Sequence, residues 1–304
     1  MRFSFRPPNA DYLGFPATPD GILRTAVRAE SLGFDTLLVN DHVIVGPEMA
    51  ELWGNTFDPL VTLSFLAAHT KQIRLATSVL IIPYRNPIIT AKMVATLDQL
   101  SGGRVTLGVG AGWTEAEFAA LSVSYADRGA ATDEYLAVCQ ACWAPDPVTF
   151  TGERYQFESM HCSPKPVQTP HPPIWVGGSS NPALRRAAKF AEVWQPVPMA
   201  LDALVERKAF LRSACDKVGR EEAPRIRMSF RVNFTDITGH GGTDANGARL
   251  RGHGQPAEVA GDMRRYCEEA GLDEFQINFN GCGSLEQLEQ SMDVFMQEVR
   301  PLIA

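Results

Sequence analysis

The stretch IRLATSVLIIPYRNPIITAKMVATLDQLSGGRVTLGVG, residues 73–110, contains a complete strand–helix–strand unit. Ile73–Ile82 has the apolar pattern of a buried strand. Ile88–Leu100 follows as a helix that carries on one face Ile89, Met93, Leu97 and Leu100. A glycine pair then turns the chain into a second apolar strand, Val105–Val109. This order of elements is typical of a parallel βαβ unit.

The same alternation continues outward in both directions and gives eight strands, each followed by a helix. The other expected strands are Phe3–Phe5, Thr36–Val39, Ile174–Val176, Val193–Gln195, Ile226–Val232 and Phe275–Phe279. The other expected helices are Gly21–Leu32, Pro59–His69, Pro182–Phe190, Leu201–Val218, Pro256–Ala270 and Leu285–Val299. This pattern predicts an α/β fold, a (β/α)₈ TIM barrel that spans residues 1–304 as one domain. A doubly wound open sheet is the alternative, but no G-x-G-x-x-G follows the first strand, as a Rossmann fold requires.

Two segments interrupt the alternation. Residues 113–172 hold two helical patterns (Glu115–Leu121 and Thr132–Trp143), a hairpin turned by Gly152 and a proline-rich loop, so we expect an insertion after the fourth strand. Residues 235–255 form a polar, glycine-rich loop after the seventh strand. Loops longer than about 12–15 residues are usually functional or disordered, and we expect this one to be a mobile lid over the barrel mouth.

Composition excludes several classes of protein. The net charge of −7 and the pI near 5.4 argue against a nucleic-acid binder or an anionic-membrane binder. The beginning of the sequence turns polar too early for a signal peptide, and no stretch has 18 uncharged apolar residues, so we expect a cytoplasmic protein. Cys139 and Cys142 form the one C-x-x-C, inside a helical pattern; a redox pair is the alternative to free thiols. No metal site is expected, because a second ligand pair is missing.

The chemistry of a TIM barrel lies at the carboxyl ends of its strands. There, residues 177–182 read Gly-Gly-Ser-Ser-Asn-Pro, a glycine-rich turn into a helix with Asn181 as the expected N-cap. Backbone N–H groups and the helix dipole favour an anion at such a turn, and Arg185 or Arg186 would add charge. The turn therefore predicts a phosphate site, with a tight turn lacking any ligand as the alternative.

Two further strand ends carry unusual residues. Gly108, Gly110 and Gly112 alternate at the exit of the fourth strand, which leaves room for a flat ring or for close packing at a barrel corner. His42 is the only histidine at a strand end, and it follows Asp41. This position suggests proton transfer or cofactor orientation, with a purely structural histidine as the alternative.

Together these residues resemble the bacterial luciferase-like monooxygenase superfamily, and its deazaflavin-dependent branch in particular. The resemblance extends over essentially the whole chain and rests on Ala29–Asp35, Asp41-His42, Pro87–Arg104, Leu107–Trp113, Pro173–Ser179 and Gln255–Val259. It implies a TIM barrel, usually a homodimer, that binds coenzyme F420 (a 5-deazaflavin) or FMN. We favour F420 on the resemblance alone.

The resemblance also assigns roles to residues. It places Asp41 and His42 beside the ring system and Gly177, Gly178 and Ser179 at the phosphate side of the cofactor. It makes Ser78 and Val79 a bulge that supports the ring from behind, with a non-proline cis peptide most expected between these two residues. Gly110 is expected to lie against the cofactor as well.

Some positions depart from the family pattern. Deazaflavin-dependent sugar-phosphate dehydrogenases carry a glutamate acid where this chain has Trp113, so that activity is not expected. The Asp-Gly-Trp often found at strand six appears here as Glu192-Val193-Trp194. We expect Trp113, Trp194 and the 113–172 insertion to shape an apolar substrate pocket.

The expected function is hydride transfer to or from, or oxygenation of, a small and largely apolar organic substrate, with His42 as proton donor or acceptor. The first alternative is an FMN-dependent monooxygenase that activates oxygen. A non-catalytic flavin-binding barrel is a second alternative, but the intact Asp41-His42 pair argues against it. A cofactor-free hydrolase or aldolase would require carboxylates, a lysine or metal ligands at several strand ends, where this chain has mostly Gly, Asn, Ser and Trp.

Overall fold

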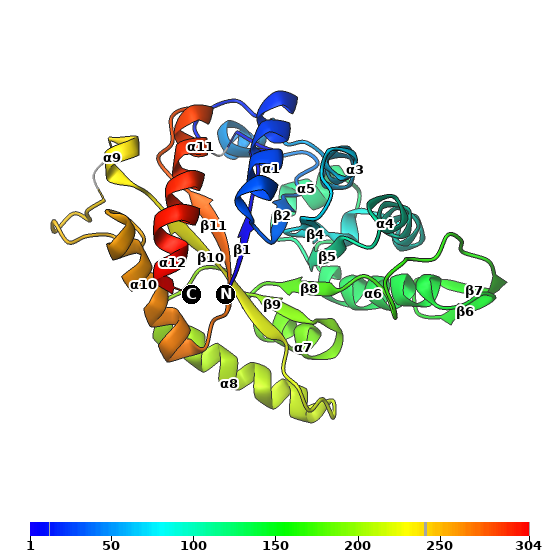
Figure 1. Cartoon of the computed structure of the whole chain (residues 1–304). Coiled ribbons are helices and arrows are strands. Elements are labelled where there is room, and N and C mark those ends of the chain that lie inside the picture. Colours follow the sequence, from blue (N-terminus) through cyan, green and yellow to red (C-terminus); the bar gives the residue numbers. More distant parts are fainter. Residues whose placement is uncertain (12, 240–241, 304) are drawn as a thin grey trace.

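The computed structural model describes residues 1–11, 13–239 and 242–303, and its main feature is a closed parallel barrel (Figure 1). Going round the barrel, the strands are β1 (Arg2–Phe5), β2 (Thr36–Val39), β3 (Arg74–Thr77), β5 (Val105–Gly110), β8 (Ile174–Gly177), β9 (Val193–Gln195), β10 (Arg225–Val232) and β11 (Glu274–Phe279). β11 pairs with β1 and closes the ring. The predicted (β/α)₈ TIM barrel is therefore confirmed.

The third strand is interrupted by a bulge. β3 ends at Thr77, and the short β4 (Leu80–Ile81) then resumes the pairing with β5. Leu75 pairs with Val105 and Leu80 with Val109, so five steps along β3–β4 match four steps along β5. One extra residue on one strand bends the chain toward the barrel interior or rim.

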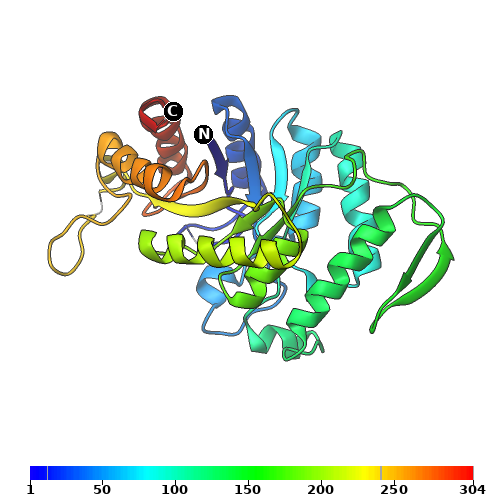
Figure 2. The same cartoon turned by 90° about the horizontal axis from the view of Figure 1, so that it is seen from below.

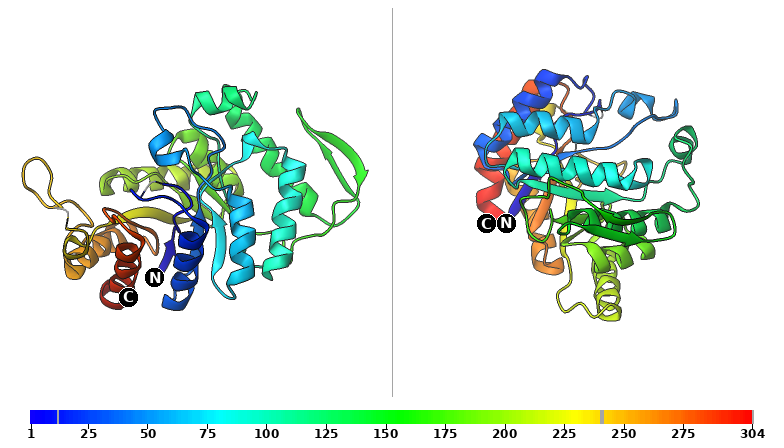
Figure 3. Two further views of the ribbon diagram at one scale, coloured as in Figure 1. Left: turned by 90° about the horizontal axis from the view of Figure 1, so that it is seen from above. Right: turned by 90° about the vertical axis from the view of Figure 1, so that its right-hand side faces the viewer.

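Helices surround the strands on all sides (Figures 2 and 3). They are α1 (Pro19–Leu32), α3 (Pro59–His69), α4 (Pro87–Ser101), α6 (Arg128–Trp143), α7 (Asn181–Phe190), α8 (Leu201–Lys217), α10 (Pro256–Ala270) and α11 (Leu285–Val294), which continues through η2 (Phe295–Val299) into α12 (Arg300–Ile303). Their ends follow from local sequence. Before α4, the Asn86 side chain accepts hydrogen bonds from the N–H groups of Ile88 and Ile89, and Gly102 ends the helix with φ +68°.

Shorter elements lie within the loops at the barrel mouth and within the insertion. They are α2 (Ala50–Trp53), η1 (Ile82–Tyr84), α5 (Glu115–Ala120) and α9 (Thr235–Thr238). The antiparallel hairpin of β6 (Val148–Thr151) and β7 (Gln156–Met160) projects beyond α6 at the right of Figure 1. Gly152 lies in the turn between the two strands, as expected.

Helix α4 differs from its expected orientation. Ile89 and Leu100 are 60% and 73% exposed and Met93 is also exposed, whereas Leu97 is buried. The small residues Ala91 and Ala95 face the barrel instead, because α4 packs closely between α3 and α6. The outward side of α3 and α4 therefore carries an apolar face, which we call the α3–α4 face, made of Val61, Phe65, Ile89, Met93 and Leu100.

The barrel floor is filled by side chains from β10 and its neighbours. Arg227, Ser229 and Arg231 alternate along β10 and share its inward face. Arg227 is completely buried, donates to Gln195 Oε1 (2.5 Å) and lies over the Trp175 ring (4.0 Å). Burial lowers the pKa of Arg227 to about 9. Arg231, two inward positions further along the strand, is exposed at the mouth.

Candidate active site

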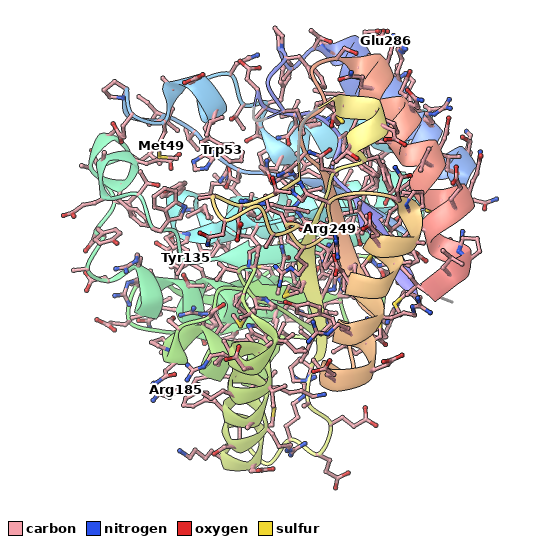
Figure 4. The ribbon with its side chains drawn as sticks, turned by 90° about the vertical axis from the view of Figure 1, so that its left-hand side faces the viewer. Met49, Trp53, Tyr135, Arg185, Arg249 and Glu286 are labelled. Atoms are coloured by element: carbon pink, nitrogen blue, oxygen red, sulfur yellow. The ribbon has the colours of Figure 1, made fainter. Side chains whose placement is uncertain are left out.

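A cavity of about 870 Å³ opens at the carboxyl ends of the strands. Its walls come from the ends of β1, β3, β5, β8, β9, β10 and β11, together with α2, whose Trp53 is labelled in Figure 4. A side pocket of about 230 Å³ shares several walls with it, including Trp53 and Trp113, and contains His42. This is the place where barrel enzymes carry out chemistry.

The charged side chains that line the main cavity have one sign. Among the described residues that line it, every charged side chain is an arginine: Arg6, Arg128, Arg186 and Arg231. The chain as a whole has a net charge of −7. The cavity is therefore locally positive in an acidic protein, which suits an anionic ligand.

The predicted bulge lies at the back of this cavity. The Ser78–Val79 peptide is cis, as expected. Ser78 Oγ accepts a hydrogen bond from Gln195 Nε2 (2.7 Å) and donates one to Gln276 Oε1 (3.1 Å). A Cβ on Gly110 would lie 2.6 Å from Val79 Cγ2, and one on Gly177 would lie 2.9 Å from Val79 Cγ1. Both glycines are therefore required for the Val79 side chain to enter the cavity wall.

Glycine is needed at position 108 for a different reason. A Cβ there would lie 2.0 Å from the Thr77 carbonyl oxygen, so this glycine allows close packing of β5 against β3, and it gives no room to a ligand. Gly112, with φ +81°, also lies against protein atoms, the nearest being the Phe118 ring. Close packing, the alternative stated above, explains the Gly108 position; Gly110 and Gly112 also line the cavity.

The glycine-rich turn after β8 forms another wall, to which Gly177, Gly178 and Ser180 contribute. Ser180 caps α7, one residue before the expected Asn181, because its Oγ accepts from the Ala183 N–H. Gly178 has φ +108° and its N–H donates to the Gln195 carbonyl (3.0 Å). Ser179 does not line the cavity, since its hydroxyl accepts a hydrogen bond from Val197 N (3.1 Å).

Two arginines stand beside this turn. Arg186 donates to Asp133 Oδ1 (2.5 Å) and to the Gly129 carbonyl (2.9 Å). Arg128 donates to the Gly112 and Tyr125 carbonyls. Arg185, by contrast, points away from the cavity and is exposed on the surface (Figure 4).

The two tryptophans expected in the substrate pocket have different surroundings. Trp113 is 64% exposed and lines both the main cavity and the side pocket. Trp194 is fully buried behind the glycine-rich turn and donates from Nε1 to the Gly178 carbonyl (2.8 Å). Trp194 therefore supports the turn from behind and does not form a wall of the cavity.

Asp41 is buried, and both of its carboxylate oxygens are engaged. They accept hydrogen bonds from Arg85 (2.6 and 2.8 Å) and from the Ile81 N–H (2.8 Å). Burial raises the pKa of the Asp41 carboxyl, although the bonds from Arg85 act in the opposite direction. In this arrangement Asp41 fixes the position of β4 next to the bulge.

His42 has a partner that the sequence did not indicate. Its Nδ1 lies 3.2 Å from Oε2 of Glu117, a buried glutamate on α5. Glu117 also accepts hydrogen bonds from Tyr84 Oη (3.0 Å) and from the Val43 N–H (2.6 Å). Burial by itself would raise the pKa of Glu117, but these hydrogen bonds outweigh it and hold the pKa below its ordinary value. The carboxylate therefore fixes the imidazole ring and leaves Nε2 for other contacts.

Glu117 and Trp53 are the functional candidates that sequence reasoning missed. A glutamate in the first turn of a helix ordinarily belongs to its exposed face, because it complements the helix dipole. Trp53, whose ring lies 5.0 Å from that of His42, is on a four-residue helix that has no periodic pattern. The usable signal was the position of Glu117, four residues after Trp113 at a strand end.

The 235–255 loop has structure of its own. It begins with α9, and isolated bridges join Asn233 to His253 and Thr243 to Arg249. Arg249 pairs with Asp262 of α10 through two hydrogen bonds of 2.8 Å. None of its described residues lines the main cavity, and residues 240–241 lie outside the described ranges. The mobile lid remains a prediction.

The cysteine pair of α6 has the surroundings of structural thiols. Cys139 and Cys142 are buried and unpaired. Burial raises the pKa of both thiols, that of Cys142 to about 12. A thiol that resists ionisation is a poor redox nucleophile, which favours the structural interpretation.

Residues 3–239 match the sequence profile of the luciferase-like monooxygenase family. The chain belongs to this family. An uncharacterized protein of Mycobacterium tuberculosis is 34% identical over 212 residues, which cover 65% of this chain and 74% of that protein. The FMNH₂-dependent dimethylsulfone monooxygenase of Pseudomonas putida is 34% identical over 136 residues, 43% of this chain and 37% of that enzyme.

The luciferase-like fold extends over the whole chain. The structure of an F420-dependent secondary alcohol dehydrogenase, determined with an F420–acetone adduct, covers 100% of this chain and 99% of its own, with a TM-score of 0.81 and 20% identity. Membership of the luciferase-like family makes this protein an oxidoreductase. Within the described residues, no helix is long and apolar enough to cross a membrane.

Proposed function

We propose that the whole chain, residues 1–304, works as one domain and catalyses an oxidoreduction with coenzyme F420 on a small organic substrate. The observation that carries the proposal is the joint geometry of the main cavity. A bulge at Val79 forms its back, two glycines give that bulge space, and an arginine-flanked turn after β8 forms one end. A flat ring with an anionic tail is complementary to these three features.

The residues present fit such a cofactor on steric and electrostatic grounds. Val79, Gly110 and Gly177 would hold the ring, and Gly178, Ser180 and Arg128 would surround the phosphate side. Ser179 and Asp41 would act from behind, since their side-chain oxygens are already bonded to protein. The volume of about 870 Å³ is at the upper end for ligand pockets and leaves space for a substrate beside the ring.

When bound, F420 supplies hydride transfer, whereas reduced FMN supplies oxygen activation. The protein contributes position, exclusion of water and a proton. His42 is the proton donor or acceptor in this proposal, because Glu117 fixes Nδ1 and Nε2 remains available. Trp53 and Trp113 form apolar walls beside it.

The surface next to the glycine-rich turn favours F420 over FMN. Arg185 and Arg207 lie outside the turn, beside Asn181 and over the Phe210 ring. Arg207 is ion-paired with Glu206, whereas Arg185 has no carboxylate partner among the described residues. Although Arg185 points away from the cavity, an anionic tail longer than a single phosphate would follow the outer surface past the turn and reach it. FMN is the second candidate, because a relative that is 34% identical is named as FMNH₂-dependent.

The test is a fluorescence titration of the purified protein with F420 and with FMN. We expect F420 to bind more tightly. Arg185→Gln should weaken F420 binding several-fold and FMN binding less, while Arg264→Gln, at an exposed arginine of α10, should change neither. Tighter binding of FMN would favour the second candidate, and absence of binding of either cofactor would contradict the proposal.

We also propose a homodimer that acts in the cytoplasm. The α3–α4 face exposes Val61, Phe65, Ile89, Met93 and Leu100. An exposed group of large apolar side chains on two adjacent helices commonly marks an interface. A second copy of the same chain is the occupant we propose, since a twofold axis would bring the same apolar face of each copy into contact. The unpaired cysteines suit a reducing compartment.

A further inference from the structure

The cavity wall formed by β10 and β11 has donors that no protein group uses. Arg231 lies near the end of β10 and Asn280 directly follows the end of β11, and both line the main cavity. The Arg231 guanidinium has no hydrogen bond or ion pair with any residue in 1–11, 13–239 or 242–303, and the same holds for the Asn280 side chain. A guanidinium that lines a cavity without a partner is available to a ligand.

The other three arginines of the cavity differ from Arg231 in this respect. Arg186 is paired with Asp133, Arg128 with two backbone carbonyls, and Arg6 donates to Asn40 Oδ1 (3.0 Å). The charge of Arg231 acts on two other basic side chains, His253 and Arg251. Burial lowers the pKa of His253, and the charges of Arg249 and Arg231 lower it further. The nearby carboxylate of Asp262 is already bound by Arg249.

The barrel order places Arg231 opposite the bulge. β3, which leads into Val79, is the third of the eight barrel strands, and β10 is the seventh, so they face each other across the mouth. The glycine-rich turn follows β8, the fifth strand, and lies between them. A ring that rests on Val79 with its phosphate at this turn would therefore present its other face toward Arg231.

We propose that Arg231 and Asn280 form a subsite for the anionic group of the substrate, which is an organic carboxylate or a similar oxyanion with an apolar body. The apolar body would lie against Trp53, Trp113 and Ile81, which line the same cavity. The guanidinium can bind a carboxylate through two parallel hydrogen bonds, and the Asn280 amide can donate a third. This inference rests on the proposed function, because it takes the space facing the bulge as the substrate site.

The test compares two probes of equal shape and different charge, hexanoate and hexanamide. Their dissociation constants are measured by tryptophan fluorescence, since Trp53 and Trp113 line the cavity, with and without FMN present. Wild type should bind hexanoate about tenfold or more tightly than hexanamide, as expected for a charge-assisted hydrogen bond. Arg231→Gln should abolish this preference by weakening hexanoate binding alone, and Arg231→Lys should retain part of it.

Arg264→Gln is the matched control, since it removes one exposed positive charge outside the cavity and should leave the preference unchanged. Circular dichroism melting verifies that Arg231→Gln is folded. Equal preference in wild type and Arg231→Gln would overturn the subsite, as would a wild type without preference. Weaker binding of F420 or FMN to Arg231→Gln, with the hexanoate preference intact, would assign Arg231 to the cofactor instead. Failure of cofactor binding in wild type with the preference intact would count against the proposed function alone.

Discussion

Glu117 Oε2 lies 3.2 Å from His42 Nδ1, and the carboxylate that makes this contact is almost completely buried. The two residues come from different barrel units, one directly after β2 and the other on α5 after β5. Tyr84 Oη and the Val43 N–H also donate hydrogen bonds to this carboxylate. Glu117 thus acts on the imidazole as a positioning residue, and its effects can be separated from those of His42 itself.

Glu117→Gln should lower kcat by about 10²-fold, at the low end of the contribution of a proton-transfer group, and change cofactor affinity less than threefold. The amide cannot accept from all of the present donors, so the imidazole loses its fixed orientation. The measurement is kcat against the cofactor dissociation constant. Glu115→Gln, in the same helix but exposed, is the control. A fall in cofactor affinity as large as the fall in kcat would contradict a positioning role.

The same residue predicts a pH dependence of stability. The pKa of Glu117 is lower in the folded protein than its ordinary value of 4.5, so the unfolded chain binds more protons in the interval between the two values. The stabilisation by Glu117 is complete above about pH 4.5 and is lost as the pH falls through the folded pKa. In urea unfolding, the advantage of wild type over Glu117→Gln should therefore be constant near neutral pH and shrink in acid. An advantage that is independent of pH would refute this.

His42→Ala should lower turnover by about 10²–10⁴-fold and leave cofactor affinity nearly unchanged. Turnover falls because the proton donor or acceptor is lost, whereas the cofactor is held by the bulge and the turn. His69→Ala, at the exposed end of α3, is the control. If His42→Ala keeps wild-type turnover, His42 is a structural residue.

Gly178→Ala should weaken cofactor binding about tenfold or more. The added Cβ lies at the cavity wall, 3.2 Å from Ala183 Cβ, and the φ of +108° strains any residue other than glycine by about 1–3 kcal/mol. Some loss of stability therefore accompanies the change. Gly219→Ala, at φ +70° with no atom within 4 Å, controls for backbone strain. Equal affinity of Gly178→Ala and Gly219→Ala for the cofactor would contradict the assignment of the turn to the cofactor site.

Ile89→Lys combined with Leu100→Lys should convert the protein from dimer to monomer. Both side chains are more than half exposed on the α3–α4 face, and two buried lysines per copy cannot be solvated in an apolar interface. Analytical ultracentrifugation measures the change. Val205→Lys, at an exposed valine of α8, should remain dimeric. A monomeric wild type would contradict the proposal directly.

The sequence was most informative where several local signals agreed. Pro59–His69 and Pro256–Ala270 have the predicted bounds, because each begins at a proline that follows a capping residue. Thr36–Val39 was equally clear, as a short apolar run in a parallel sheet. The family pattern located the bulge at Ser78–Val79 and the turn at Gly177–Gly178.

What could not be predicted depends on contacts between distant segments. The burial of Glu117 requires His42 and Tyr84, which are more than 30 residues away in the chain. Ile89 and Leu100 have the spacing of a core face, but spacing does not tell which side of an apolar helix faces the barrel. The surroundings of Trp194 could not be predicted for the same reason. A tryptophan at a strand end can point into the barrel mouth or lie behind the neighbouring turn.

The arginine lining of the cavity also affects how fast an anion arrives. A chain of net charge −7 repels small anions at long range, while the four arginines attract them once they come within roughly 8 Å, the screening length at physiological salt. Added salt first weakens the outer repulsion and then the inner attraction. Capture of an anionic ligand should consequently be fastest at an intermediate ionic strength, and inorganic phosphate or sulfate in a buffer would compete for the same mouth.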